Sequence, residues 1–174
     1  MRFNNQLLLA LSSSLLLLLA GTHPARAVSS TATVTLKATF TAPPCTIATP
    51  DQVFLGGMLP GSRSYLPFNI SISCPSVTST VLYAQIVQGV LTSGSTDRVD
   101  MSGPAGSMGT PAQLWLTTEG KTVTLDGSGA TDSAKGFCAG TADRTCSLTP
   151  SVQVVADTPK GQTTATVRFS VMYP

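Results

Sequence analysis

The 174-residue sequence predicts an all-β fold, an antiparallel sandwich of short strands. Seven or eight segments alternate apolar and polar side chains with the period of two that a half-buried strand requires. Turn-forming glycine and proline residues, 15 and 12 in number, separate these segments, and no long helical pattern with caps lies between them. Strands at regular spacing without intervening helices favour antiparallel packing over a parallel sheet.

The first 27 residues have the pattern of a secretory signal peptide rather than of a folded element. Arg2 is followed by a leucine-rich stretch, and Ala25-Arg26-Ala27 supplies small residues before a cleavage point. The apolar stretch is interrupted by serines and is short for a membrane span. We therefore expect an exported mature chain that begins at Val28.

Removing this leader changes the electrostatics of the chain. The ten Lys and Arg residues include Arg2 and Arg26, so eight remain against eight Asp and Glu, and the net charge of the mature chain is near zero. Such a surface offers no electrostatic footprint for nucleic acid. The single histidine, His23, also lies in the leader, so the mature chain has no histidine for a catalytic triad or a metal site. We expect no enzymatic activity, no catalytic residue and no cofactor.

The first half of the mature chain contains four strand-like segments. Residues 32–40 alternate cleanly until Pro43-Pro44, where the missing amide donors stop a ladder. Residues 53–55 are predicted to form a short strand before the turns at 56–57 and 60–61. Residues 68–74 and 80–90 have the composition of two further strands.

The second half begins with a Gly, Ser and Pro-rich stretch, residues 91–111, which is predicted to form irregular loops. Residues 112–118 and 121–127 are predicted to form a hairpin with Glu119-Gly120 at its turn. A polar excursion carries the next two cysteines, and residues 151–157 are predicted to form a strand. The last segment, residues 164–173, alternates regularly between apolar and polar residues. Because chain ends usually fray, a strand this regular at the end is expected to pair with another strand.

Four cysteines in an exported chain indicate disulfides, because no Cys-x-x-Cys pair suggests a metal site. Cys138 and Cys146 bracket a seven-residue polar stretch and are predicted to staple it. That assignment leaves Cys45 to pair with Cys74. With this pairing the folded domain begins near Pro43, and residues 28–42 form an arm outside it. In the alternative interpretation, the arm pairs with the terminal strand inside one closed sandwich.

The sequence resembles the pilins of Gram-negative chaperone–usher fimbriae, especially their minor subunits. The resemblance rests on the alternating arm before "PPCTI", on Cys45 with Cys74, on the "FNISISCP" strand and on the ending "TATVRFSVMYP". It covers residues 28–174.

The resemblance implies an incomplete immunoglobulin-like antiparallel β-sandwich, completed by a donor strand from another chain. A periplasmic chaperone first lends this strand, and at the outer-membrane usher the arm of a neighbouring fimbrial subunit replaces it. The donor side chains would be Ala32, Val34, Leu36, Ala38 and Phe40. The groove and chaperone-binding strand would present Ala165, Val167, Phe169, Val171 and Tyr173.

These features favour a structural subunit of an adhesive surface fimbria, exported through the periplasm to the cell surface. Two alternatives stay open at the level of the sequence. One is a fimbrial tip adhesin, although such proteins generally carry a second, receptor-binding domain and lack the donor arm. The other is a self-complemented secreted sandwich whose arm fills its own groove and which acts as a binding module.

Overall fold

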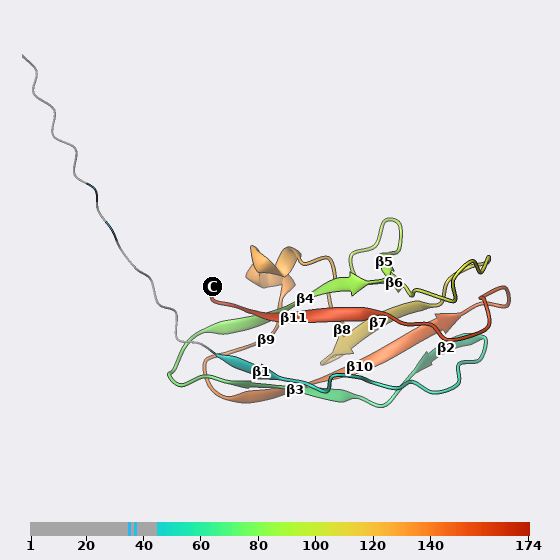
Figure 1. Cartoon of the computed structure of the whole chain (residues 1–174). Helices are drawn as coiled ribbons and strands as arrows, with labels where there is room; N and C mark the ends of the chain where they lie inside the picture. Colours follow the sequence, from blue (N-terminus) through green and yellow to red (C-terminus); the bar gives the residue numbers. More distant parts are fainter. Residues whose placement is uncertain (1–34, 36, 38–44) are drawn as a thin grey trace, which may run out of the picture. The chain divides into compact units, whose positions relative to one another are not determined.

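The computed structural model describes residues 35, 37 and 45–174, and residues 45–174 belong to one compact unit built from two antiparallel sheets (Figure 1). The larger sheet has eight strands: β1 (Thr46–Ala48), β2 (Gly61–Ser64), β3 (Phe68–Ser73), β5 (Val90–Leu91), β6 (Val99–Asp100), β7 (Gln113–Thr118), β8 (Lys121–Thr122) and β10 (Arg144–Val154). The smaller sheet has the order β11-β4-β9, from β11 (Thr166–Met172), β4 (Thr80–Gln88) and β9 (Phe137–Gly140). The all-β, antiparallel prediction is confirmed.

The described residues contain two single-turn 3₁₀ helices, η2 (Ser128–Ala130) and η3 (Ser133–Lys135). In the described part of the chain, no helix is both long enough and apolar enough to span a membrane. The predicted leader (residues 1–27) and nearly all of the arm (28–42) lie outside the described residues.

Strand β10 organises the larger sheet, whose main path runs β1-β3-β10-β7-β6-β5. Its first half pairs with β3 and its second half with β2, while β7 pairs along its other side. Pro150 lies in the middle of this strand, where the Tyr65 amide donates to its carbonyl at 2.8 Å. In an antiparallel strand, the N–H and C=O groups of one residue point to the same side. The position of the missing Pro150 N–H therefore faces the interruption between β2 and β3.

The predicted hairpin at Glu119-Gly120 is present but short. Both turn residues have positive φ, 49° and 76°, as a two-residue type I′ turn requires. Strand β8 ends at Thr122 rather than near residue 127. Val123 and Leu125 are nevertheless buried, so the continuing segment contributes to the core without a regular ladder.

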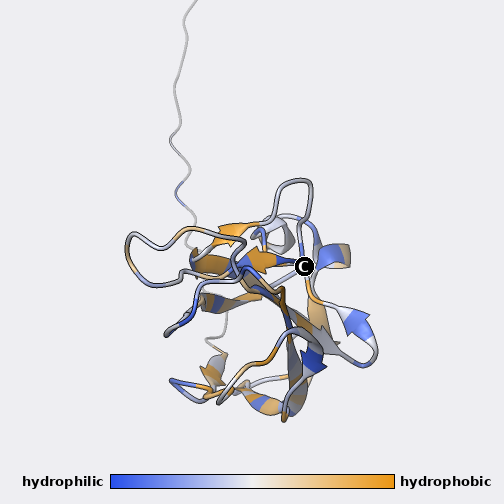
Figure 2. Cartoon of the chain, turned by 90° about the vertical axis from the view of Figure 1, so that its right-hand side faces the viewer, coloured by the Kyte–Doolittle hydropathy of each residue, from blue (hydrophilic) through white to orange (hydrophobic). Residues whose placement is uncertain are grey.

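The main core lies between the two sheets, and much of the hydrophobic colouring in Figure 2 falls on the strands. Its fully buried members come from β3, β4, β6, β7, β10 and the segment after β8, and are Ile70, Ile72, Leu82, Ala84, Val99, Leu116, Val123, Leu125 and Leu148. A smaller cluster of Met101, Ala112, Leu114 and Val152 adjoins the loops that precede β11. The two clusters together draw on strands of both sheets.

Both predicted disulfides are present, Cys45–Cys74 and Cys138–Cys146. Two element predictions are wrong. Residues 53–55 form no strand, because no strand of the described chain is hydrogen-bonded to them, and the stretch 91–111 is not wholly irregular, since it contains β6. The polar excursion around the second cysteine pair, whose composition predicts no strand, contains β9 and the first half of β10.

Candidate functional site: an open groove beside the terminal strand

The terminal strand β11 lies at the edge of the smaller sheet. It pairs with β4 in an antiparallel register that places Val167 opposite Ile86, Phe169 opposite Ala84 and Val171 opposite Leu82. Within the described chain β4 is its only partner strand, apart from an isolated bridge between Ser102 and Thr164. The outer row of β11 backbone groups is therefore available to another strand.

The inward-facing side chains of β11 are only partly covered. They pack against the main core, yet none of them is fully buried. Two of their register partners on β4 differ sharply, since Leu82 is 0% and Ala84 1% exposed, whereas Ile86 is itself only partly buried. The core is thus complete beneath the first part of β4 and incomplete beneath β11.

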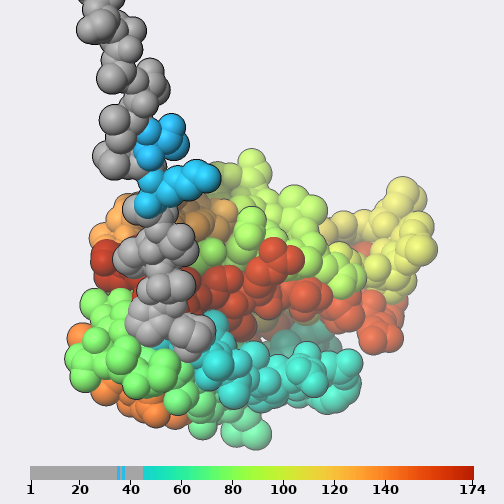
Figure 3. Space-filling model, turned by 60° about the vertical axis from the view of Figure 1, so that its left-hand side comes forward, coloured from blue at the N-terminus to red at the C-terminus, as the bar shows by residue number. Residues whose placement is uncertain are grey.

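A groove with a volume of about 1140 Å³ lies beside this incomplete edge. One wall is the stretch from Thr163 to Val167 together with Phe169, and the opposite wall is residues 49–60, here called the edge segment. The red terminal strand and the teal edge segment run along one another in Figures 1 and 3. Leu114 and Leu116 of β7 and Phe68 of β3 contribute apolar side chains to the lining, and the stretch from Val154 to Gln162 lines it as well.

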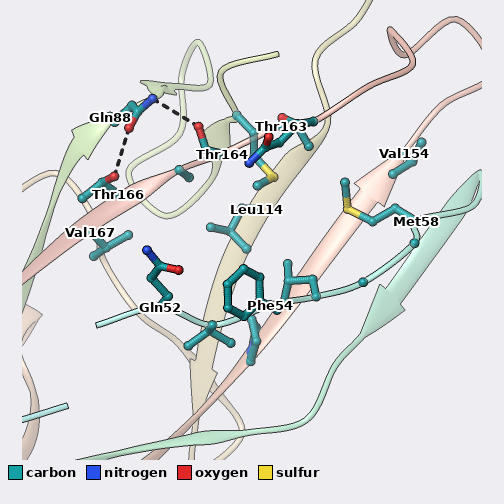
Figure 4. Close-up of a pocket in the computed structure, with 18 of the residues that line it drawn as sticks. Gln52, Phe54, Met58, Gln88, Leu114, Val154, Thr163, Thr164, Thr166 and Val167 are labelled. Atoms are coloured by element: carbon teal, nitrogen blue, oxygen red, sulfur yellow. Dashed lines mark hydrogen bonds between the residues drawn. The ribbon is translucent and has the colours of Figure 1, made fainter. Parts of the chain in front are cut away.

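The edge segment is itself unpaired. Outside the strand ladders, no backbone hydrogen bond joins residues 49–60 to another described residue, so this stretch leaves most of its backbone polar groups without a backbone partner. Gly56, at φ +73°, interrupts any extended conformation. Phe54 is 87% and Leu59 67% exposed, and Figure 4 shows Phe54 and Gln52 beside the groove. Sequence reasoning missed this wall, because its apolar residues show no clear period.

Hydrogen-bonding side chains mark one end of the groove (Figure 4). The Gln88 amide donates to the Thr164 hydroxyl at 3.1 Å, and the Thr166 hydroxyl donates to the Gln88 carbonyl oxygen at 3.2 Å. These bonds fasten the end of β4 to the start of β11. They use neutral groups, so this end of the groove can meet a peptide backbone without the cost of burying a charge.

The other end of β11 is tied to the first disulfide. The Cys45 amide donates to the Tyr173 hydroxyl at 3.0 Å, which links the next-to-last residue to the start of the described domain. Cys45 is bonded in turn to Cys74 at the end of β3. The terminal strand is therefore fixed at this end and open along its outer edge.

The predicted groove residues fall into two groups. Ala165, Val167 and Phe169 line the groove directly. Val171 packs against the main core and Tyr173 bonds to Cys45, and neither lines the groove. The predicted donor residues Ala32, Val34, Leu36, Ala38 and Phe40 all lie outside the described residues.

The ionisable groups with shifted pKa values lie away from the groove. Burial lowers the pKa of the Arg144 guanidinium, which donates hydrogen bonds to the Cys138 and Thr80 carbonyls. Burial tends to raise the pKa of Asp126, but the hydrogen bond from the Ser128 amide and the charge of Lys135 outweigh this effect and lower it. The residues described contain no group of three or more side chains suited to a metal ion. The apolar side chains of Leu114, Leu116 and Phe169 in the lining suit the groove to an extended segment with apolar residues.

Comparison with solved structures places this architecture in a known class: the domain has the fold of chaperone–usher pilus subunits. One similar structure is a chaperone–usher pilus studied for the molecular basis of rod uncoiling, with 18% identity and a TM-score of 0.56 over 84% of this chain and 98% of that chain. Another is the P pilus rod subunit PapA, with 20% identity and a TM-score of 0.54 over 76% of this chain and 100% of that chain. No protein-family model and no curated protein matches the sequence.

Proposed function

We propose that this chain is a non-catalytic structural subunit of a surface fimbria that assembles by donor-strand exchange. The single observation that carries the proposal is the groove between two unpaired backbone edges, that of β11 and that of the edge segment. A strand placed there would gain hydrogen bonds from β11 and would cover the partly exposed face of Phe169 and Val167. The fold that the chain shares with pilus rod subunits supports the same assignment.

The donor in this proposal is the arm of a second copy or of a related subunit. Its five alternating apolar residues run from Ala32 to Phe40, and the five inward residues of the terminal strand run from Ala165 to Tyr173. Each set spans eight residue steps, about 26 Å in an extended strand. The arm is thus as long as the edge it would cover.

The partners follow from this mechanism. Before assembly a periplasmic chaperone would occupy the groove, and an outer-membrane usher would be the place of exchange. The chain would then reach the cell surface within a fimbria that contributes to adhesion. An unprotected groove of this kind would expose apolar surface and an open strand edge, and both promote aggregation.

The proposal is tested by the size of the purified mature chain. We expect light scattering to detect oligomers of increasing mass, because the free arm of each chain can enter the groove of a neighbour. Leu36→Asp places a charge on the inserted face of the arm and should abolish these oligomers. Lys37→Asp changes the adjacent residue on the opposite face and should leave the oligomers intact.

A monomeric wild-type chain that does not bind an added peptide of residues 28–42 would contradict the proposal and favour the self-complemented module. Chaperone co-purification from periplasmic extracts supplies an independent check. Recovery of the chain without any bound periplasmic protein would argue against the chaperone step.

A further inference from the structure

Phe169, the aromatic residue on the β11 wall of the groove, lies between two other aromatic rings. The Phe68 ring of β3 lies 6.3 Å from it between centroids, in a tilted arrangement. The Phe137 ring of β9 lies 6.2 Å from it, nearly edge to face at 80°. Both distances are in the range of favourable aromatic pairs. These two contacts come from opposite sheets and together fix where the Phe169 ring sits.

The Cys138–Cys146 disulfide connects the strands that carry these two contacts. Cys138 follows Phe137 directly in β9, which belongs to the smaller sheet. Cys146 lies in β10 of the larger sheet, where it pairs with Ile70 of β3, and two residues on Leu148 pairs with Phe68. A closed path therefore runs from Phe169 through Phe137, the disulfide, β10 and Phe68 back to Phe169.

The ladder between β9 and β4 does not by itself hold Phe137 firmly. Its register is broken between Thr80 and Leu82, so that Phe137 opposite Leu82 is its last regular pair. Cys138 has a φ of 55°, a left-handed conformation that costs free energy for a residue other than glycine. Such a backbone persists only when its surroundings fix it, and here the disulfide and the hydrogen bond from Arg144 Nε to the Cys138 carbonyl do so.

We propose that the Cys138–Cys146 disulfide is a positioning device for the groove: it holds Phe137 against Phe169 and so presents the Phe169 ring to an inserted strand. The inference rests on the proposed function, since the strand is the arm of a second copy of this chain. Without the bond, β9 can shift and Phe169 loses one of its two aromatic neighbours. The inserted strand then meets a less ordered wall and leaves faster.

The test compares release rates of a fluorescent peptide of residues 28–42 from mature chains that carry Leu36→Asp, which prevents self-donation. Cys138→Ser with Cys146→Ser should speed release roughly three- to tenfold, the range expected for one aromatic pair. Phe137→Leu should give a similar increase with the disulfide intact, which keeps the test valid if the cysteine variant folds poorly. The combined variant should be no faster than the more affected of the two, because both changes remove one contact.

Val99→Ala is the matched control, because Val99 is fully buried in the main core but does not line the groove. It should lower the melting temperature without speeding release. Equal acceleration by Val99→Ala, or strictly multiplicative effects of the cysteine and Phe137 changes, would overturn the positioning role. Unchanged release from the cysteine variant would overturn it while leaving the proposed function intact. No peptide binding by the unmodified groove would overturn both.

Discussion

Phe169 and Arg168 are neighbours in sequence with opposite surroundings. Phe169 lines the groove and touches two aromatic rings, whereas the Arg168 side chain is exposed on the other face of β11. Period-two alternation of this kind could be read directly from the sequence. The rings around Phe169 could not, because Phe68 and Phe137 come from distant segments and meet it only through the sandwich topology.

Replacing Phe169 with Asp should abolish recovery of chaperone-bound subunit from the periplasm. An unpaired carboxylate in an apolar groove costs several kcal/mol, about 3 or more, in any strand-filled complex. Arg168→Asp should change recovery little, since exposed charge changes usually cost about 0.5 kcal/mol or less. Immunoblots of chaperone pull-downs make the comparison, and equal loss for both variants would contradict the assigned faces.

Arg144 is a polar residue that links several strands through its hydrogen bonds. Its guanidinium donates to the carbonyls of Cys138, Ala142 and Thr80, and also to the Thr80 hydroxyl. It thereby joins β10 to β9 and β4. No sequence pattern indicates this role, because Arg144 lies in a polar stretch between two cysteines.

Arg144→Ala should destabilise the domain by roughly 2 kcal/mol, because the nearly buried Thr80 and its carbonyl lose a charged donor. Arg144→Lys should restore only part of this, since an ammonium group lacks the planar fork that reaches several acceptors at once. Urea unfolding of the peptide-bound chain measures both. A lysine variant as stable as wild type would show that the positive charge alone suffices.

At the scale of elements, the sequence predicted those strands whose alternation reflects one buried face. Strands β3, β7 and β11 are such cases, whereas β4 was predicted from its composition. The first half of β10 was missed because polar residues and Pro150 resemble a loop, and Pro150 is tolerated only where its missing amide meets the interruption between β2 and β3. Residues 53–55 have strand-like composition, but a strand also requires a neighbour to pair with.

The arm, residues 28–42, can be tested as an element. Deleting it should leave chaperone binding unchanged, because the groove is built from residues 49 onward. The truncated subunit should accept a strand but donate none, and should therefore appear only at the end of any oligomer. Mass spectrometry of complexes formed with intact subunits measures this. Loss of the chaperone complex on truncation would place the arm within the folded domain instead.

At the scale of the whole molecule, the described domain has a complete core under one side of the smaller sheet and an incomplete one under the other. The two ends of β11 differ. The end at Tyr173 is hydrogen-bonded to Cys45, which forms a disulfide with Cys74, whereas the groove lies beside the part from Ala165 to Phe169. The sequence predicted the class of this architecture and both cysteine pairs, and three of its five candidate groove residues, Ala165, Val167 and Phe169, line the groove. It could not supply the second wall, which is irregular in the isolated chain.

The wild-type chain purified without its chaperone should be poorly stable or self-associated. A groove of about 1140 Å³ beside an unpaired edge leaves Phe169 and its neighbours partly exposed to water until a strand is inserted. Adding excess arm peptide should raise the melting temperature in proportion to the logarithm of its concentration. A monomer of high thermal stability that ignores the peptide would show that the domain needs no further strand.

The tie between Cys45 and its two partners has a mechanical consequence. In a fimbria under tension, force would act on the subunit at two places. One is the arm just before Cys45, and the other is the inserted strand that pairs with β11. Cys45 is joined covalently to Cys74 and by hydrogen bond to Tyr173, so force can pass from one chain to the next without peeling β1 from the sheet. In single-molecule stretching, reducing agent should lower the rupture force and add a lengthening step from the released residues 46–73. A wild-type trace that already shows this step would mean that tension takes another route through the subunit.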